Sequence, residues 1–420
     1  MMNTPYMPFY TKNATVCSMS ELTSLNAGVT HLTIGSNCMN ENSTVLLHFT
    51  RFAQLKELVV GDNSLNGLSA LRLDGLSGLE RVVVGSNSFK NSDSNSELVV
   101  RDCSALRSVT LGANSFASFG VMEIERVPLL EELSVGDGCL KNVDALSLNG
   151  LSGLKRVVVG SSSFSNKNGA FSVVNCTSLE SVEIGSSSMG AYSVLSVDNT
   201  PSLEVLSIGS NAFKNVNEMR LVGLSKLKRI EISADSFTNK EGSFELKSCA
   251  IMTELVVGNR SMSSFSSFEI TTTPSLKTIT IGSDSFKKVG AFALSGLPAL
   301  ESVMIGSDSF SQRSGHFVLT SPSVKALVVG DGSFSQYTDC SIHDVPSLET
   351  LSIGDNSFVA SSLELKNMNG LKSVVIGRRG FENCERAVFE SLPELTSIQL
   401  GWSALSFKDI DNATLVMKSV

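Results

Sequence analysis

The sequence holds few of the residues from which catalytic and metal sites are usually built. Its 420 residues include only 4 His and 1 Trp. The eight cysteines form no C-x-x-C pair and have no zinc-ligand spacing. Neither a G-x-S-x-G phrase nor a G-x-x-x-x-G-K-[ST] loop occurs, which argues against a hydrolase serine and against a P-loop nucleotide site. We therefore expect no enzymatic activity, no cofactor and no metal.

The chain also lacks long hydrophobic runs and an excess of positive charge. No stretch approaches the roughly 18 apolar residues of a transmembrane helix, so no membrane span is expected. The net charge of −8 argues against nucleic acid as a general partner, because proteins that bind it present a basic surface. The first twenty residues lack the basic and apolar regions of a secretory signal. These features predict a soluble cytoplasmic protein; the alternative is a cell-surface protein whose signal peptide is missing from this gene model.

One eleven-residue phrase occurs sixteen times along the chain. The copy at 276–286 reads LKTITIGSDSF, and the copy at 348–358 reads LETLSIGDNSF. The shared frame is L-x-x-L-x-I-G-x-x-S-F, and it recurs at a nearly constant interval of about 24 residues, which is typical of a solenoid. Alternating apolar residues at frame positions 4 and 6 have the period of a β-strand. We number the coils 1 to 16 by these phrases, so coil 1 contains Gly35 and coil 16 contains Gly401.

A second apolar alternation follows in the other half of the coils, as in FSVVNC at 171–176 and FELKSC at 244–249. It predicts a second short strand on the opposite face of each coil. The predicted fold class is thus a β-rich solenoid of about sixteen coils of 24 residues, with parallel sheets and little or no α-helix. Residues 1–28 are expected to be an irregular N-terminal cap, 29–405 the solenoid, and 406–420 the C-terminal end of the last coil.

The phrase resembles the leucine-rich repeat frame LxxLxLxxNxL at positions 1, 4, 6, 9 and 11. Within that family, NCTSLESVEIGSSSM at 175–189 is similar to the BspA-like subtype in its C-x-x-L and I-G-x-x-S elements. The Pro after Ile and the Phe-x-x-Cys spacing of that subtype are missing. The resemblance implies that the Asn of position 9 bonds backbone groups of neighbouring coils.

Other frame positions have roles that follow from residue size. Gly at position 7 suits a tight corner where coils pass closely. The residue at position 10 is small, usually Ser, because room inside a corner is limited. Position 11 is Phe in ten copies, so most of the 22 Phe are expected to form core ladders.

A longer period of three coils lies on top of the repeat. One proline series takes equivalent places in every third coil, at Pro128, Pro201, Pro274 and Pro346. One cysteine series does the same, at Cys103, Cys176 and Cys249. Members of that series lie three rungs apart, roughly 14 Å, whereas a disulfide needs Cα atoms within about 7 Å. They are predicted to be free, buried thiols.

The candidate binding residues lie where the copies differ. Outward position 5 of coils 10 to 15 carries Val256, Thr280, Met304, Val328, Ser352 and Val375. Position 2 of coils 11 to 15 carries alternating charges, Lys277, Glu301, Lys325, Glu349 and Lys372. These charges predict either stabilising pairs, worth about 0.2–1 kcal/mol each, or a charged recognition stripe.

Two further sets of residues depart from the frame. In coil 15 Arg378 and Arg379 replace the usual small residues, and the neighbouring coil 16 contains Trp402, the only Trp of the chain. Arg and Trp are frequent at binding hot spots, although terminal repeats are commonly atypical. Asp replaces Asn at position 9 in coils 9, 11 and 12 and predicts either turn capping or a cation ladder, at Asp235, Asp284 and Asp308.

Together these features predict a non-catalytic recognition scaffold that binds a protein or another macromolecule through its extended strand face. One alternative is the recognition part of a cell-surface adhesin of the BspA-like kind. Another is a solenoid enzyme acting on polysaccharides, which would need a charged cluster that interrupts the repeat. The expected partner-binding residues are Val256, Lys277, Thr280, Met304, Val328, Ser352, Val375, Arg378, Arg379 and Trp402.

Overall fold

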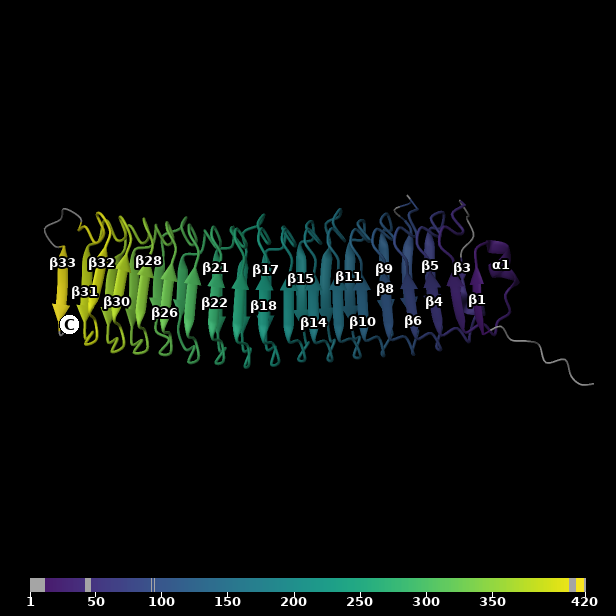
Figure 1. Ribbon diagram of the computed structural model, residues 1–420, viewed down its shortest axis with the longest axis horizontal. Helices are drawn as coiled ribbons and strands as arrows, with labels where there is room; N and C mark the ends of the chain where they lie inside the picture. The colour runs from purple at the N-terminus through teal and green to yellow at the C-terminus, as the bar shows by residue number, and fades with distance from the viewer. Residues whose placement is uncertain (1–11, 42–46, 92, 94, 408–412, 419–420) are drawn as a thin grey trace, which may run out of the picture. The chain divides into compact units, whose positions relative to one another are not determined.

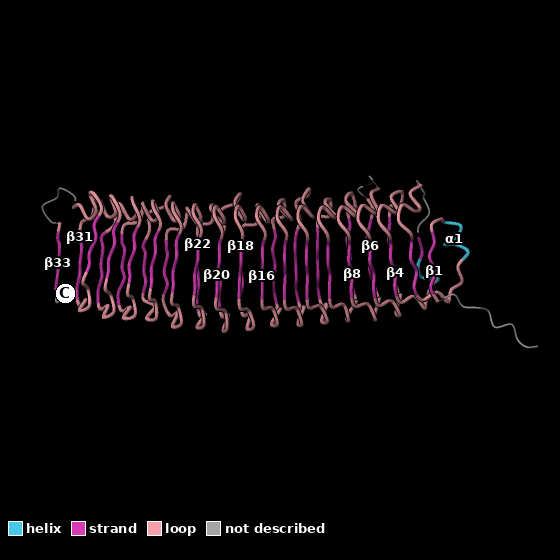
Figure 2. Tube along the Cα trace, in the orientation of Figure 1, coloured by secondary structure: helices cyan, strands magenta, loops and turns pink. Residues whose placement is uncertain are grey.

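The computed structural model describes residues 12–41, 47–91, 93, 95–407 and 413–418. The chain forms two compact units, residues 1–192 and 193–420, and each is described by itself. Nearly all regular structure is parallel strand, and the helices among the described residues are α1 (Met19–Ser24) and the 3-10 helix η1 (Phe49–Arg51), as Figure 2 shows. The predicted β-solenoid with little helix is confirmed. Within the described residues, no helix is long and apolar enough to cross a membrane.

In the first unit, the eleven-residue phrases form a parallel sheet. Each phrase contributes positions 3 to 6 as a strand, and these strands lie side by side along the unit (Figure 1). Neighbouring strands pair in the same register, so that Leu58 lies opposite Val82 and Val82 opposite Val109. The strands are β1 (Asn13–Val16), β2 (His31–Ile34), β4 (Glu57–Val60), β6 (Arg81–Val84), β8 (Ser108–Leu111), β10 (Glu132–Val135), β12 (Arg156–Val159) and β14 (Ser181–Ile184).

The predicted second strand of each coil is also present in this unit. These strands are β3 (Leu47–His48), β5 (Ala70–Asp74), β7 (Glu97–Arg101), β9 (Val121–Glu125), β11 (Ala145–Asn149) and β13 (Ala170–Val174). The strands from β3 to β9 pair in sequence, and β11 pairs with β13. The described strands β9 and β11 are not hydrogen-bonded to each other, so this second side of the unit is divided there.

The second unit repeats the same arrangement. Its phrase strands are β16 (Val205–Ile208), β18 (Arg229–Ile232), β20 (Glu254–Val257), β22 (Thr278–Ile281), β24 (Ser302–Ile305), β26 (Ala326–Val329), β28 (Thr350–Ile353), β30 (Ser373–Ile376) and β32 (Ser397–Leu400). Each pairs in parallel with the next. The strands of the other side are β15 (Val194–Asp198), β17 (Glu218–Val222), β19 (Ser243–Lys247), β21 (Ser267–Thr271), β23 (Ala291–Leu294), β25 (His316–Leu319), β27 (Asp339–His343), β29 (Ser362–Lys366), β31 (Arg386–Glu390) and β33 (Thr414–Lys418).

The second side of this unit is divided as well. The strands from β17 to β21 form one sheet and those from β23 to β33 another, with no hydrogen-bonded pairing between the described strands β15 and β17 or between β21 and β23. A proline lies three residues after each strand that precedes a break, at Pro128, Pro201 and Pro274. Pro346 follows β27 in the same way, yet β27 pairs with β29, so proline alone does not create the break.

Buried serines at position 10 join the coils of each unit. In eleven coils this serine is fully buried, and its Oγ donates a hydrogen bond of 2.6–3.0 Å to the position-7 carbonyl of the preceding coil. Several of these hydroxyls also accept a bond from the serine N–H of the preceding coil, as Ser309 does from Ser285 at 3.2 Å. The small size of position 10 is only part of its role, because the hydroxyl pairs backbone groups that would otherwise be buried without partners.

The resemblance implies that the Asn of position 9 bonds backbone groups of neighbouring coils, and the structure shows that this role is only partly correct. All sixteen position-9 residues adopt a positive φ, between 54° and 71°, and Asn, Asp and Gly are the residues that tolerate this left-handed region best. Among the described residues, asparagine side chains bond one another, as Asn63 Nδ2 does with Asn37 Oδ1 at 2.8 Å. The backbone N–H of this residue makes the bond between coils, as Asn63 N–H does to the Ser86 carbonyl.

The position-11 residues also adopt a positive φ, between 50° and 60°, although all are Phe, Leu or Met. A left-handed backbone costs a bulky residue about 1–2 kcal/mol, so the surrounding packing must hold it in place. The packing is an aromatic stack, in which Phe310 and Phe334 lie 4.8 Å apart and Phe334 and Phe358 lie 4.9 Å apart between ring centroids. A second stack from the other side of the coils includes Phe268 and Phe292, at 5.4 Å. The predicted phenylalanine ladders are confirmed.

Close approach between coils favours glycine at position 7, which fifteen of the sixteen coils carry, with Ser233 in coil 9. A Cβ on Gly282 would lie 2.5 Å from the Asn259 backbone nitrogen, and a Cβ on Gly85 would lie 2.6 Å from the Asp62 nitrogen. Both distances are shorter than real Cβ contacts, so a side chain there would push the coils apart.

The N-terminal cap contains regular structure where the sequence predicts an irregular segment. Strand β1 pairs with β2 and continues the parallel sheet by one rung. Helix α1 follows, and a capping box stabilises its N-terminus. Ser18 Oγ accepts from the Glu21 N–H, and the Glu21 carboxylate accepts from the Ser18 N–H. The pairing of β1 with β2 stabilises the cap, because β1 forms hydrogen bonds with backbone groups at the edge of β2 that would otherwise lack strand partners. The predicted extent of the solenoid, 29–405, stays a prediction, as does the role of 406–420, of which 408–412 and 419–420 lie outside the described residues.

A disulfide joins Cys17 to Cys38, with Cα atoms 4.8 Å apart. The register of β1 with β2 places Cys17 level with Gly35 at position 7, and Cys38 occupies position 10 of the next rung. This is the pair of positions that a serine bond links elsewhere, so the disulfide takes the place of that hydrogen bond at the cap.

The serine ladder predicts a specific loss of stability. Replacing Ser309→Ala removes the donor to the Gly282 carbonyl and the acceptor for the Ser285 N–H, and we expect unfolding to become easier by about 2 kcal/mol. Urea unfolding followed by circular dichroism measures this change. Ser302→Ala, on the outward side of β24, should stay within about 0.5 kcal/mol, and equal losses in both variants would contradict the ladder.

The disulfide predicts how the cysteines react with iodoacetamide. In the native protein without reductant no cysteine should be labelled, since the other six are free but buried. Addition of dithiothreitol should expose the Cys17 thiol alone, whereas unfolding with reductant should label all eight. Mass spectrometry of the peptides distinguishes these states, and native labelling of Cys17 without reductant would exclude the disulfide.

Candidate interaction surfaces

The six predicted position-5 residues form one row across the second unit. Strand register places Val256 opposite Thr280, Thr280 opposite Met304, and Met304 opposite Val328. Ser352 and Val375 continue the row on the next two strands. Met304 is 45% exposed and Val328 41%, which is high for apolar side chains in the middle of a sheet. The structure therefore brings these residues together on one surface.

The outward side chains of β22 to β30 are all uncharged. We call this surface the neutral strip, and its residues at positions 3 and 5 are Thr278, Thr280, Ser302, Met304, Ala326, Val328, Thr350, Ser352, Ser373 and Val375. The corresponding positions on β18 and β20 carry Arg229, Glu231 and Glu254. In the first unit, such positions carry charges on many strands, including Arg156 on β12 and Glu183 on β14.

The position-2 charges flank the neutral strip and pair with one another. Lys325 Nζ lies 2.9 Å from a Glu301 oxygen, and Lys372 Nζ lies 3.2 Å from a Glu349 oxygen. The hydrogen bond from Lys325 holds the pKa of the Glu301 carboxyl below its usual range. Lys277 makes no ion pair with another described residue. Pairing between neighbouring rungs is confirmed, but such exposed pairs contribute only about 0–1 kcal/mol each.

The first unit has a matching ladder, in which Glu131 lies between Arg107 at 2.6 Å and Lys155 at 2.8 Å. Hydrogen bonds from Lys155 and then Arg107 lower the pKa of the Glu131 carboxyl. Because both units carry this pattern, it belongs to the repeat and does not distinguish a binding surface.

Arg378, Arg379 and Trp402 lie on two neighbouring turns at the end of the second unit. Arg378 pairs with Asp355 at 2.8 Å, and its bonds hold the pKa of that carboxyl down. Arg379 pairs with Glu382 at 2.8 Å. Trp402 is 72% exposed, and on the last rung the apolar side chains Ile398, Leu400, Leu415 and Met417 are exposed too.

The aspartates of the predicted cation ladder, Asp235, Asp284 and Asp308, have a different role in the structure. Asp235 accepts two hydrogen bonds from Arg260, and Asp284 pairs with Lys287. All three aspartates have a positive φ, which fits the turn-forming role. Among the described residues there is no group of His, Cys, Asp and Glu side chains that could hold a metal ion.

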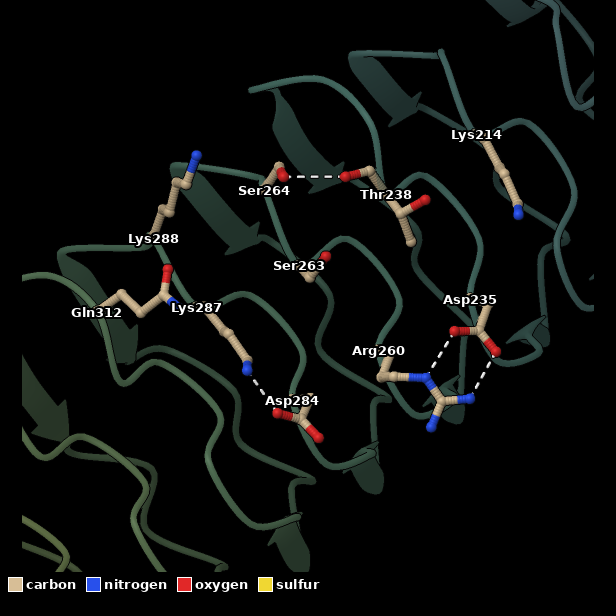
Figure 3. Close-up of a pocket in the computed structure, with 10 residues that line it drawn as sticks. All are labelled: Lys214, Asp235, Thr238, Arg260, Ser263, Ser264, Asp284, Lys287, Lys288 and Gln312. Atoms are coloured by element: carbon tan, nitrogen blue, oxygen red, sulfur yellow. Dashed lines mark hydrogen bonds and ion pairs between the residues drawn. The ribbon is translucent and has the colours of Figure 1, made fainter.

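These basic partners belong to a groove along the turn edge of the second unit, which the sequence did not reveal. The groove has a volume of about 460 Å³, and ten residues from coils 8 to 12 line it (Figure 3). Four of them are basic, Lys214, Arg260, Lys287 and Lys288. Counted from the first residue of each phrase, they lie at positions 9, 12 and 13, of which the last two follow the eleven-residue frame. No single position of the repeat therefore contains them.

The buried thiols offer no nucleophile. Cys103, Cys176 and Cys249 are free and fully buried, as predicted. Burial raises the pKa of the Cys103 and Cys249 thiols to about 11, so both stay protonated at neutral pH. Each donates to a strand carbonyl, as Cys176 does to Leu148 at 3.4 Å. The thiols act as small core residues.

Comparison with known proteins agrees with this repeat. The profile of the BspA type leucine rich repeat region, in 6 copies, matches residues 191–317 and 259–388. A comparison with curated protein sequences gives no match.

Two solved structures illustrate the structural likeness. A leucine-rich repeat protein from Bacteroides ovatus is 14% identical, with 92% of this chain and 78% of that chain covered and a TM-score of 0.31. An internalin from Listeria monocytogenes is 12% identical, with 90% and 88% covered and a TM-score of 0.29. On its repeat, its parallel strands and the matching profile, the part of the chain from 191 to 388 is similar to the BspA type leucine rich repeat region.

Proposed function

We propose that the protein is a non-catalytic scaffold that binds a protein partner on the neutral strip of the second unit. The observation that supports this proposal is the two rows of five uncharged outward residues on β22 to β30, with Met304 and Val328 exposed at their centre. Charged residues are depleted from the cores of protein interfaces, whereas Met is enriched there.

Strand propensity does not explain the composition of the strip. Val and Thr favour strands, but Ala326, Ser302 and Ser373 are not strong strand formers. Small outward side chains instead leave a flat surface that a partner can approach closely. The charged outward residues of β18 show that the fold itself accepts ionised side chains at these positions.

The size of the strip bears on what else the partner touches. Five strands at about 4.8 Å spacing, each with four residues at about 3.3 Å, cover roughly 300 Å². A stable interface buries about 800 Å² on each partner. A partner must therefore also contact the flanking charges, of which Lys277 is the one in coils 11 to 15 that has no ion-pair partner among the described residues.

The turn residues at the end of the second unit form a separate part of the proposal. Arg378 and Arg379 are already paired with carboxylates, which leaves the exposed Trp402 as the residue best placed to contact a partner. Its neighbours on the last rung are apolar and exposed, so a partner there would bury apolar surface.

A second candidate function is the recognition part of a cell-surface adhesin. The Cys17–Cys38 disulfide favours it, because disulfides persist in oxidising compartments and are rare in the cytoplasm. This observation also favours the cell surface over the cytoplasmic location predicted from the sequence. A polysaccharide-acting enzyme has no comparable support, since the candidate carboxylates at Asp235 and Asp284 are engaged in ion pairs.

The neutral strip predicts the effect of two charges. The double variant Met304→Lys/Val328→Lys should lose binding of its specific partners by at least about tenfold, because burying unpaired charges at an interface is costly. Quantitative affinity capture from an extract of the source organism, with wild-type and variant proteins in parallel, measures this loss.

The matched control is Val59→Lys/Val158→Lys, at position 5 of the first unit. It adds the same charge on outward strand residues flanked by charged neighbours. Partners of the strip should bind this control as they bind the wild-type protein. Equal capture by all three proteins would exclude the neutral strip as the binding surface.

The adhesin candidate predicts accessibility from outside the cell. The product of the full gene should be labelled by a membrane-impermeant biotin reagent on intact cells, and Cys17 should be recovered in its disulfide form. A cytoplasmic protein labelled only after lysis is the control. Labelling of the product only after lysis, with Cys17 reduced, would contradict a surface location.

A further inference from the structure

The groove on the turn edge of the second unit is an interaction site of a different kind from the neutral strip. Its basic residues come from successive turns, with Lys214 in coil 8, Arg260 in coil 10, and Lys287 and Lys288 in coil 11. Four cations and two carboxylates give its lining an excess of two positive charges, although the chain as a whole has a net charge of −8.

Both carboxylates of the groove are occupied by internal pairs. Asp235 accepts from Arg260 Nε at 2.6 Å and from Arg260 Nη2 at 2.7 Å. Asp284 lies 2.5 Å from Lys287 Nζ. The bonds from Arg260 lower the pKa of the Asp235 carboxyl, so this pair stays ionised at neutral pH. The groove therefore presents no free carboxylate for a cation.

The excess charge lies at the two ends of the groove. Figure 3 shows Lys214 at one end, pointing toward the Asp235–Arg260 pair, and Lys288 at the other. Neither Nζ has a hydrogen bond or an ion pair with another described residue. Arg260 keeps one guanidinium nitrogen directed away from Asp235, and this nitrogen is a further donor.

The spacing of these cations fits an extended chain. Coils repeat about every 4.8 Å, so Lys214 and Lys288, three coils apart, are separated by roughly 14 Å along the edge. An extended peptide rises about 3.3 Å per residue, so about four or five residues cover this distance. Side chains on one face of such a peptide recur about every 7 Å, which places a carboxylate near each end and one near Arg260.

The neutral residues of the groove discriminate among anionic ligands. None of the ten lining residues is aromatic, whereas sites for single-stranded nucleic acid combine positive charge with aromatic stacking platforms. Ser263 lies between the basic ends, and Gln312 lies beyond Lys288 at the far end of the groove. They offer hydroxyl and amide groups, which pair with a peptide backbone.

We propose that this groove binds an extended acidic peptide segment of a protein partner, with the ligand carboxylates on Lys214, Arg260 and Lys288. This site does not depend on the neutral strip, and either can exist without the other. Because Arg260 and Lys288 are exposed and Lys214 is half-buried, salt screens these charges and binding weakens as the salt concentration rises.

The test uses the full chain and a fluorescein-labelled twelve-residue peptide of alternating Glu and Ser, with the matching Gln-Ser peptide as the neutral probe. Fluorescence anisotropy should show saturable binding of the acidic peptide alone. The variant Lys214→Glu/Lys288→Glu should bind about tenfold more weakly or worse, since two attractive contacts become repulsive.

The control variant Lys226→Glu/Lys247→Glu changes the net charge equally on exposed lysines of the same unit that do not line the groove. It should keep the wild-type affinity, and circular dichroism checks that both variants are folded. Equal loss in both variants would show non-specific attraction, and equal binding of the Gln-Ser peptide would exclude recognition of carboxylates; either result overturns the proposal.

A competition experiment separates the peptide from other polyanions. If dextran sulfate or single-stranded DNA of equal charge displaces the acidic peptide at a lower concentration than unlabelled peptide does, the groove belongs to that other class and the assignment to an acidic peptide is wrong. Neither outcome affects the neutral strip, whose variant Met304→Lys/Val328→Lys should bind the acidic peptide as well as or better than the wild-type protein does.

Discussion

The hydrogen bond from a buried serine to a carbonyl of the preceding coil is the interaction on which the other features of each unit depend. It fixes the separation of two turns, so that a Cβ on Gly282 would lie only 2.5 Å from the Asn259 backbone nitrogen. With that separation fixed, the position-11 rings stack at 4.8 Å between Phe310 and Phe334. The same packing holds those residues in a left-handed backbone that none of them prefers. A repeat of this kind tolerates variation only on surfaces that the bond does not reach.

The fold could be predicted because its determinants recur at fixed spacing. Apolar positions 4 and 6 indicated the strands, and the large residues at position 11 indicated the core stack. The role of the serine was missed because its small size is visible in a sequence but its bonding partner is not. The disulfide was missed because Cys17 precedes the first phrase, and only the pairing of β1 with β2 shows that it lies level with position 7. Strand β1 and helix α1 depend on the same local pairing.

The two candidate surfaces also differ in how far they could be predicted from the sequence. The neutral strip follows two positions of the frame. The alignment of its position-5 residues could be predicted from the repeat, whereas the contribution of the uncharged position-3 residues is apparent only on the folded strands. The groove combines Arg260 from position 9 with lysines from positions 12 and 13, in the stretch where the coils vary most. Recognition built from neighbouring turns at different frame positions leaves no periodic pattern. The strands thus offer flat apolar contact and the turns offer localised charge.

The breaks in the second side of the coils bear on how such a chain changes its length. They follow β9, β15 and β21, and the prolines beyond those strands, Pro128, Pro201 and Pro274, are three coils apart. A block between two breaks begins and ends at places where the second-side strands share no hydrogen bonds. Gene duplication or deletion of one whole block would therefore reconnect equivalent rungs, with only the serine bonds and the phrase strands to rejoin. A change of one or two coils would instead bring unlike strands together. Length variants of this array are accordingly expected to differ by multiples of three coils.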